Sequence, residues 1–264
     1  MPVAKVLLLG ATGGIGRQAL LELLDRGVAV TAVVRAESRL TDEVRDHEHL
    51  TVVVRDDGAL AMGVEELAEV VRGCDAVVSC LGHSPTLAGI FGQPRSLCVD
   101  TVKLVCDTIA TVKPRLPIKF IVVNTVGVDH PDGKTDPPRG WLERVILWLL
   151  EALVPAHADN VKTSRYVYEQ AGNKGHVDFC VVRPDSLVDG ERRRNTSSEG
   201  SVGAPGDSVP LYSVHESLQN GLFNPGVTSR ANVGRFMAEL VMEEVVWTRW
   251  RGKWPQVVNV DKVD

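Results

Sequence analysis

Short apolar runs alternate with longer segments of helical periodicity along most of this 264-residue chain. The apolar runs are rich in β-branched residues and predict buried strands; they read KVLLL, VAVTAVV, LTVVV, DAVVSCLG, IKFIVVNTVG and VDFCVVRP. The segments between them space their apolar residues three and four apart, as in residues 15–26, 64–73 and 97–112, and predict helices. Continuous apolar strands separated by helices indicate a parallel sheet covered on both faces. The pattern therefore predicts an α/β fold with a doubly wound parallel sheet.

The composition of the chain changes after Pro184. Residues 195–208 are rich in Ser, Gly and Pro, which is typical of a loop. One helix over residues 231–246 and a late strand in QVVNV are expected to close the chain. We expect residues 185–229 to form a lid or small substrate lobe over the carboxyl edge of the sheet, within one domain.

Two helices are expected in residues 140–171. The first of them, WLERVILWLLEALV, is the most apolar helix of the chain. Its longest uninterrupted apolar run, residues 145–150, is too short for a bilayer, which takes about 20 residues. We therefore expect a core helix and no membrane span.

Composition narrows the class of protein. With 29 basic and 34 acidic residues the net charge is −5, which argues against a general nucleic-acid binder. The five cysteines include no CxxC pair and no Cys/His group at metal-ligand spacing, so we expect buried free thiols and no metal. Free thiols and a strand that begins by about Val3, where a signal peptide would lie, predict a cytoplasmic protein.

A glycine-rich turn, GATGGIG, joins the first predicted strand to the first predicted helix. Gly10 permits a tight turn, Gly13 lets a pyrophosphate approach the backbone, and Gly16 lets the helix pack closely on the strand. The helix N-terminus offers free amides and the positive end of its dipole to phosphates. Since the strand and helix that this motif needs are both present, we predict a dinucleotide site rather than only a tight connection. Its contacts in the turn are expected from Gly10, Thr12, Gly13, Gly14, Ile15, Gly16 and Arg17.

The end of the second predicted strand indicates which dinucleotide binds. NAD sites usually carry an acidic residue here for the ribose 2′-hydroxyl, whereas this chain reads VVRAESR, with Arg35 and no carboxylate before Glu37. A guanidinium can hold a 2′-phosphate through two hydrogen bonds at once. Arg17 and Arg39 can add positive charge, although any one of these arginines can also be a solvated surface charge. We predict NADP(H), with Arg35 as the main determinant.

Together these motifs resemble the atypical short-chain dehydrogenases/reductases of the NAD(P)H-binding, NmrA-like kind. The resemblance runs from GATGGIGR through DAVVSCLG, VVNTVGV and VVRPDSLVDG to TSRANVGRFM. It implies a Rossmann-type fold, with residues 1–264 as a single NAD(P)-binding domain. It also implies that Asp56 lies near the adenine and that Thr125 replaces the serine that polarises a substrate carbonyl. The inner ribose and phosphates would be lined by Cys80, Leu81 and Gly82.

The chain departs from the superfamily at the motif Tyr-x-x-x-Lys, in which the tyrosine donates a proton and the lysine holds the nicotinamide ribose. None of the three tyrosines has a lysine four residues later. Lys162 lies 21 residues before Arg183 (183 − 162), about the family's separation between that lysine and the RP strand. Ala158 then stands where the tyrosine would be. The resemblance thus gives Thr125 and Lys162 as catalytic residues, with Lys162 also a cofactor contact.

Other polar residues leave two interpretations open. His83 either contacts cofactor or substrate or is an exposed loop imidazole. His157 adjoins the tyrosine position but points about 100° away from it on a helix, so it is not a simple replacement. Asp159 is interpreted as an acid near a helix N-terminus, favoured by the dipole. The run at 191–194 either is a solvated loop or meets an anionic substrate.

The sequence is compatible with three functions. The first is an NADP-dependent oxidoreductase whose small acceptor, a quinone, flavin or conjugated system, is protonated by water. The second is a sensor or regulatory subunit that binds NADP without turnover, and the third is a scaffold that keeps the cofactor as a structural part. The missing tyrosine weighs against ordinary ketone reduction, while Thr125 and Lys162 favour the enzyme.

Overall fold

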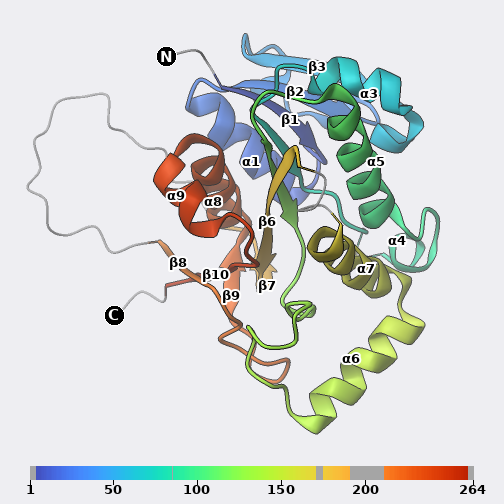
Figure 1. Cartoon of the computed structure of the whole chain (residues 1–264), viewed down its shortest axis with the longest axis vertical. Coiled ribbons are helices and arrows are strands. Elements are labelled where there is room, and N and C mark those ends of the chain that lie inside the picture. The colour runs from blue at the N-terminus through green and yellow to red at the C-terminus, as the bar shows by residue number, and fades with distance from the viewer. Residues whose placement is uncertain (1–3, 85, 171–174, 191–210, 261–264) are drawn as a thin grey trace, which may run out of the picture.

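An eight-stranded sheet runs through the centre of the protein, for which a computed structural model describes residues 4–84, 86–170, 175–190 and 211–260 (Figure 1). Its strands lie in the order β3-β2-β1-β4-β5-β6-β10-β8, and only the last pair is antiparallel. The bounds are β1 Lys5–Leu9, β2 Ala29–Val34, β3 Leu50–Val54, β4 Ala76–Ser79, β5 Ile118–Val123, β6 Val177–Pro184, β8 Tyr212–His215 and β10 Gln256–Asn259. The predicted parallel sheet is confirmed.

Helices cover both faces of this sheet. One face packs against α1 (Gly14–Asp25), α8 (Arg230–Met242) and α9 (Glu244–Trp250). The other face packs against α3 (Val64–Val71), α5 (Leu97–Val112) and α7 (Pro155–Glu169). Alternate residues of β1 enter the two cores, because successive side chains of a strand point to opposite faces. Shorter helices, α2 (Asp42–Arg45) and α4 (Leu87–Phe91), lie in the connections.

The helix predicted over residues 231–246 is in fact two helices, α8 and α9. The backbone leaves the helical conformation at Glu243, where φ is −108° and ψ is 106°. This break redirects the chain so that Trp247 and Trp250 are buried in the same core as Phe236. The apolar spacing continues across Glu243, so periodicity alone did not show the break.

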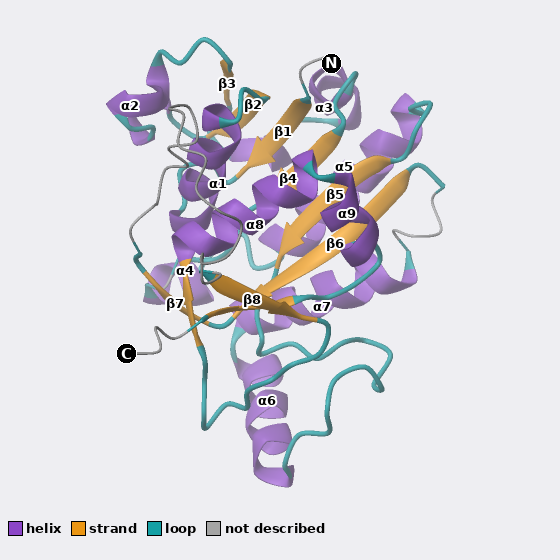
Figure 2. Ribbon diagram, turned by 90° about the vertical axis from the view of Figure 1, so that its left-hand side faces the viewer, coloured by secondary structure: helices purple, strands orange, loops and turns teal. Residues whose placement is uncertain are grey.

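The expectation of a core helix in WLERVILWLLEALV is wrong. The segment forms α6 (Trp141–Leu153), which contains no buried residue and projects from the body of the molecule (Figures 1 and 2). Trp141 is 76% exposed and Trp148 is 65% exposed. Other helices already cover both faces of the sheet, so no core surface is left for α6. Within the described residues, no helix is long and apolar enough to cross a membrane.

The region predicted as a lid is described only in part. Its residues 191–210, which include the arginine run at 191–194 and most of the Ser/Gly/Pro-rich stretch, lie outside the described residues. Before and after that gap, β7 (Ser186–Val188) pairs in parallel with β9 (Val227–Ser229). The strand β8 joins the central sheet through β10, at the edge visible in Figure 2. A lid role for residues 185–229 stays a prediction.

Candidate functional site

Several of the predicted site residues lie at the carboxyl edge of the sheet. The strands β2 and β3 lie on one side of β1, and β4, which follows them in the chain, lies on its other side. The strand order therefore reverses at β1. In open α/β sheets, ligands bind outside the carboxyl ends of the strands at such a switch point. Residues that follow the carboxyl ends of β1, β2, β3, β4 and β5 include Gly10, Arg35, Asp56, Cys80 and Thr125.

The glycine turn after β1 has the geometry that its glycines imply. Gly10 has a φ of +81°, and a Cβ on it would lie 2.7 Å from the carbonyl oxygen of Cys80. A Cβ on Gly16 would lie 2.0 Å from the carbonyl oxygen of Gly10, so neither position accepts a side chain. The amide of Gly13 donates to Gly10 O at 3.0 Å, and Arg17 N donates to Gly13 O at 2.8 Å. The helix α1 therefore begins directly at the turn, with its first amides at the carboxyl edge.

Arg230 lies against the start of α1, a position that the sequence did not reveal. A Cβ on Gly14 would lie 2.8 Å from both Cδ and Nε of Arg230. The Nη1 atom of Arg230 is 2.7 Å from Oδ1 of Asp189, an exposed carboxylate. A guanidinium beside a helix N-terminus adds positive charge to an anion-binding site. Arg230 stands in the motif TSRANVGRFM, which contributed to the family resemblance without a role for this residue.

The side chains of most other residues predicted around the phosphates are partly buried in the protein. Ile15 packs against the hydrophobic core, and Thr12 is half-buried within the turn. Cys80 Sγ lies 3.9 Å from Met237 Sδ, and burial raises the pKa of this thiol to about 12. The following residue, Leu81, is also partly buried, whereas Gly82 is exposed.

Arg35 and Asp56 end neighbouring strands, β2 and β3. The aliphatic part of the Arg35 side chain lies beside the turn after Asp56. A Cβ placed on Gly58, in that turn, would be 3.7 Å from Arg35 Cγ. Arg55 nearby is paired with Glu66. Arg35 itself is exposed, and its side chain makes no hydrogen bond or ion pair with any residue that the structure describes. Two further exposed arginines, Arg17 and Arg39, lie on α1 and after β2.

Thr125 follows β5 and is held by the loop around it. Its Oγ1 accepts a hydrogen bond from the amide of Gly127 at 3.2 Å, which leaves the hydroxyl proton free to donate. Asn124 accepts from the Thr125 amide at 2.9 Å and donates to the carbonyl of Asn160, on α7, at 3.0 Å. Lys162 follows on the same helix and is exposed. The end of β5 is thus tied to the helix that carries Lys162.

His157 lies in the first turn of α7 and is half-buried. A Cβ on Gly127 would lie 3.4 Å from His157 Cε1 and 3.7 Å from Thr125 Oγ1, so both side chains border this glycine. The ring also lines a cavity of about 370 Å³ between α6, α7 and the loop after β5. Burial lowers the pKa of His157; Glu151 opposes this and Arg139 adds to it. Burial therefore favours the neutral form of the imidazole.

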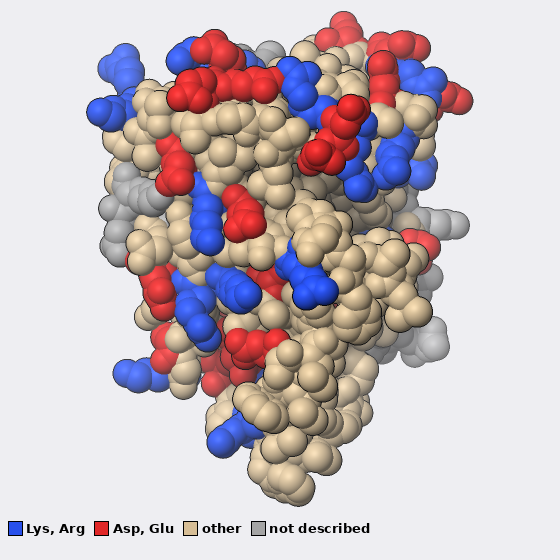
Figure 3. Space-filling model, turned by 90° about the vertical axis from the view of Figure 1, so that its right-hand side faces the viewer, with Lys and Arg blue, Asp and Glu red and all other residues tan. Residues whose placement is uncertain are grey.

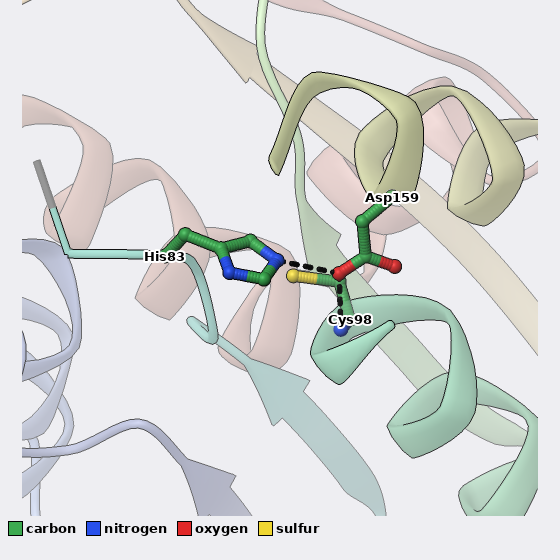
Figure 4. Close-up of side chains that lie close together, drawn as sticks. All are labelled: His83, Cys98 and Asp159. Atoms are coloured by element: carbon green, nitrogen blue, oxygen red, sulfur yellow. Dashed lines mark hydrogen bonds and ion pairs between the residues drawn. The ribbon is translucent and has the colours of Figure 1, made fainter. Parts of the chain in front are cut away.

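His83, Cys98 and Asp159 meet between the loop after β4, α5 and α7 (Figure 4). His83 Nε2 lies 2.8 Å from Asp159 Oδ2, and its Nδ1 lies 3.2 Å from the carbonyl oxygen of Gly89. The Asp159 carboxylate also accepts the amides of Cys98 and Val99 at 2.8 and 3.0 Å. Asp159 therefore caps α5, rather than serving only the dipole of its own helix as the sequence indicated. His83 is not an exposed loop imidazole, since its side chain is 7% exposed.

The same three side chains place one ligand-type atom each within 4.8 Å of one another, which the sequence spacing did not reveal. However, both oxygens of Asp159 already accept backbone amides. Burial and the Asp159 charge raise the pKa of the Cys98 thiol well above its usual value. The cluster is thus a hydrogen-bonded joint between three segments.

A buried ion pair fixes the loop beyond Thr125. Arg183, whose side chain is fully buried, contacts the two oxygens of Asp136 at 2.5 and 3.0 Å and donates to Trp254 O at 2.8 Å. Burial alone raises the pKa of Asp136, but the hydrogen bonds and charge of Arg183 outweigh it and hold that pKa below its usual value. In the sequence, Arg183 served only to measure the separation from Lys162. Its ion pair with Asp136 was not predicted, because the two residues are far apart along the chain.

This edge has a glycine turn at a helix N-terminus, basic side chains beside it and a switch point in the sheet, as a dinucleotide site requires. The profile of the NAD(P)H-binding family matches residues 10–244. The chain belongs to this family. Members of the NAD(P)H-binding family bind a nicotinamide dinucleotide, so the cofactor of this chain is of that kind. No curated protein matches it at a significant level.

Solved structures of proteins named as oxidoreductases or reductases share the fold. The oxidoreductase ylbE from Lactococcus lactis is 18% identical, with 97% of this chain and 91% of that chain covered and a TM-score of 0.60. ChuY, an anaerobillin reductase from Escherichia coli O157:H7, is 17% identical, with 98% of both chains covered and a TM-score of 0.61. A candidate NADH-flavin reductase from Streptococcus pneumoniae TIGR4 is 15% identical, with 97% and 100% covered and a TM-score of 0.59. The Rossmann-type fold is thereby confirmed.

Proposed function

We propose that this member of the NAD(P)H-binding family is an NADPH-dependent oxidoreductase that reduces a small conjugated, quinone-like or flavin-like acceptor. The observation that carries the proposal is the free hydroxyl proton of Thr125 at the carboxyl edge, with alanine at position 158 where a tyrosine would donate a proton. Two structures of the same fold are named as an NADH-flavin reductase and an anaerobillin reductase, which agrees with a conjugated acceptor.

The preference for NADP(H) rests on Arg35. Its guanidinium is exposed and unpaired among the described residues, beside the turn that follows Asp56. A 2′-phosphate offers it the bidentate partner that the protein does not supply. In this assignment Arg17 and Arg39 add charge, and Asp56 lies near the adenine.

The remaining cofactor contacts follow from the residues present at the edge. The amides of the glycine turn and the guanidinium of Arg230 would hold the pyrophosphate, with the backbone of residues 80–82 along the inner ribose. The Lys162 ammonium would donate to the hydroxyls of the nicotinamide ribose. Bound NADPH supplies a hydride to the acceptor.

Thr125 carries the proposed electrostatic role. Its hydroxyl donates a hydrogen bond to the acceptor oxygen, where negative charge develops as the acceptor is reduced. A threonine hydroxyl is too weak an acid to give up its proton at neutral pH, so water protonates the product. Such a site favours acceptors whose reduced anion is already stabilised, and it disfavours simple ketones.

An acceptor screen tests this function. Purified protein is mixed with NADPH and with a quinone, a flavin, a conjugated enal or a simple ketone, and NADPH oxidation is followed alongside NADPH binding. We expect turnover with at least one of the first three classes and much slower turnover with the ketone. Tight binding with no oxidation of any acceptor would instead establish the alternative function, a non-catalytic NADP-binding sensor or regulatory or scaffold subunit.

A further inference from the structure

The helix α6 presents an apolar face that no described part of the chain covers. Its exposed large apolar side chains are Trp141, Leu142, Val145, Trp148, Leu149 and Leu153. The end of the molecule that α6 forms carries few charged side chains in Figure 3. A contiguous exposed apolar surface of this kind marks an interaction site on an otherwise ordinary protein.

The pattern along α6 is that of a helix-pairing seam. Trp141, Val145, Trp148 and Ala152 follow one another at spacings of four, three and four residues, and all four are exposed. At about 100° per residue they lie within an arc of roughly 60°. Alternating spacings of three and four define the a and d positions of two paired helices. The seam therefore fits another α-helix better than an irregular partner.

The two flanks of this seam differ in chemistry. Leu142 and Leu149 lie on one flank, and the exposed Arg144 and Glu151 lie on the other, which also borders the cavity beside α7. The members of each pair are seven residues apart and so occupy the same heptad position. The charged flank offers one positive and one negative side chain, placed symmetrically about the midpoint between residues 147 and 148.

The symmetric placement of Arg144 and Glu151 favours a second copy of the same helix as the partner, in the antiparallel direction. In an antiparallel pair of identical helices, equivalent flanks face each other across a two-fold axis. An axis at the helix midpoint brings Arg144 opposite Glu151 of the partner subunit, and the same contact forms again by symmetry. A parallel pair would instead set the charged flank of one helix against the leucine flank of the other. We propose that α6 forms an antiparallel homodimer with α6 of a second copy of this chain.

A membrane surface fits α6 less well. Helices that lie on membranes carry Lys and Arg on the polar side to meet anionic headgroups. The polar side of α6 carries Glu143 and Glu151 against Arg144, and the whole chain has a net charge of −5. The helix has 13 residues and is thus about 20 Å long, so its pairing falls below the standard interface of about 800 Å² per partner. We therefore expect a dimer of micromolar affinity.

Sedimentation velocity of the full chain over a range of concentrations tests the proposal. We expect the wild type to shift from monomer to dimer as its concentration rises, and Trp148→Glu to remain monomeric. Arg144→Glu places like charges opposite each other and should weaken the dimer by roughly three- to tenfold. The double variant Arg144→Glu/Glu151→Arg should restore it, whereas Arg115→Glu, at an exposed arginine away from α6, should have no effect.

The folding of each variant is checked by circular dichroism, and α6 contains no buried residue whose loss would unfold the protein. A wild type that stays monomeric at all concentrations would overturn the proposal. A double variant no stronger than Arg144→Glu would overturn the antiparallel pairing. A monomer that floats with phosphatidylcholine vesicles, while Trp148→Glu does not, would show that the occupant is a membrane.

Discussion

His83 and Asp159 are joined by a hydrogen bond of 2.8 Å between Nε2 and Oδ2, across 76 residues of sequence. The same carboxylate accepts two amides at the start of α5, so one side chain links the loop after β4, α5 and α7. The loop in question follows Gly82, at the edge where we place the cofactor. Because this loop follows Gly82, the joint holds the backbone beside the proposed site in place.

Replacing Asp159 with alanine should destabilise the protein by about 2–4 kcal/mol. The change leaves two helix amides and one imidazole nitrogen without their acceptor in a buried place. Urea unfolding measures the effect. Asp100→Ala, at an exposed acid in the first turn of the same helix, is the control and should cost less than about 1 kcal/mol. Equal effects of the two variants would show that Asp159 is not a cap.

Arg35→Ala should weaken NADPH binding by roughly 10- to 100-fold and leave NADH binding nearly unchanged. The loss of a charge-assisted contact to the 2′-phosphate costs about 1.5–3 kcal/mol, and NADH has no such phosphate. Titration of both cofactors against both proteins gives the four dissociation constants. Arg115→Ala, at an exposed arginine before β5, is the control. A similar loss for both cofactors would remove Arg35 from the assignment.

Asp136→Asn should destabilise the protein by about 3 kcal/mol at neutral pH, because it removes the charge opposite the buried Arg183. The folded-state pKa of Asp136 is lowered, so its contribution is present above the unfolded pKa of about 3.9 and is lost as the pH falls through the folded value. The difference in unfolding free energy from wild type should thus be constant from about pH 5 to 7 and shrink below about pH 4. Asp46→Asn, at an exposed carboxylate, should show no such difference. A gap that persists unchanged in acid would contradict the ion-pair account.

Substitutions of Thr125 and Lys162 should affect turnover and NADPH affinity differently. Thr125→Val removes the hydroxyl and should lower kcat by at least about tenfold with little change in NADPH affinity, while Thr125→Ser should retain most activity. Lys162→Ala should impair both NADPH affinity and turnover. Steady-state kinetics on an accepted substrate, with cofactor binding measured separately, distinguish these effects. Unchanged turnover in Thr125→Val on every accepted substrate would exclude a catalytic role for Thr125.

Local features of the site could be predicted from the sequence. The turn around Gly10 and Gly16 depends on neighbouring residues, and its strand and helix have strong periodicity of their own. The position of Arg35 after the second strand is local in the same way. By contrast, Arg230 reaches the start of α1 only because α8 packs beside that helix in the fold.

Whether the apolar face of α6 is buried could not be predicted from the sequence in the same way. The composition of α6 identifies a helix with one apolar side, but whether that side enters a core depends on which other helices cover the sheet. The joint of His83 with Asp159 is also non-local, since no spacing rule connects a loop after β4 to an acid on α7. These contacts depend on tertiary packing, which the periodicity of one segment does not contain.

The most direct test of the oxidoreductase assignment is the stoichiometry between NADPH consumed and acceptor reduced, with the wild type and Thr125→Val measured side by side. NADPH absorbance and acceptor reduction are followed in the same reaction under anaerobic conditions. The account predicts one two-electron reduction of a conjugated acceptor for each NADPH, many turnovers per protein, and a loss of rate in Thr125→Val while NADPH still binds. NADPH bound tightly by the wild type, with no acceptor reduced above the protein-free rate, would contradict it.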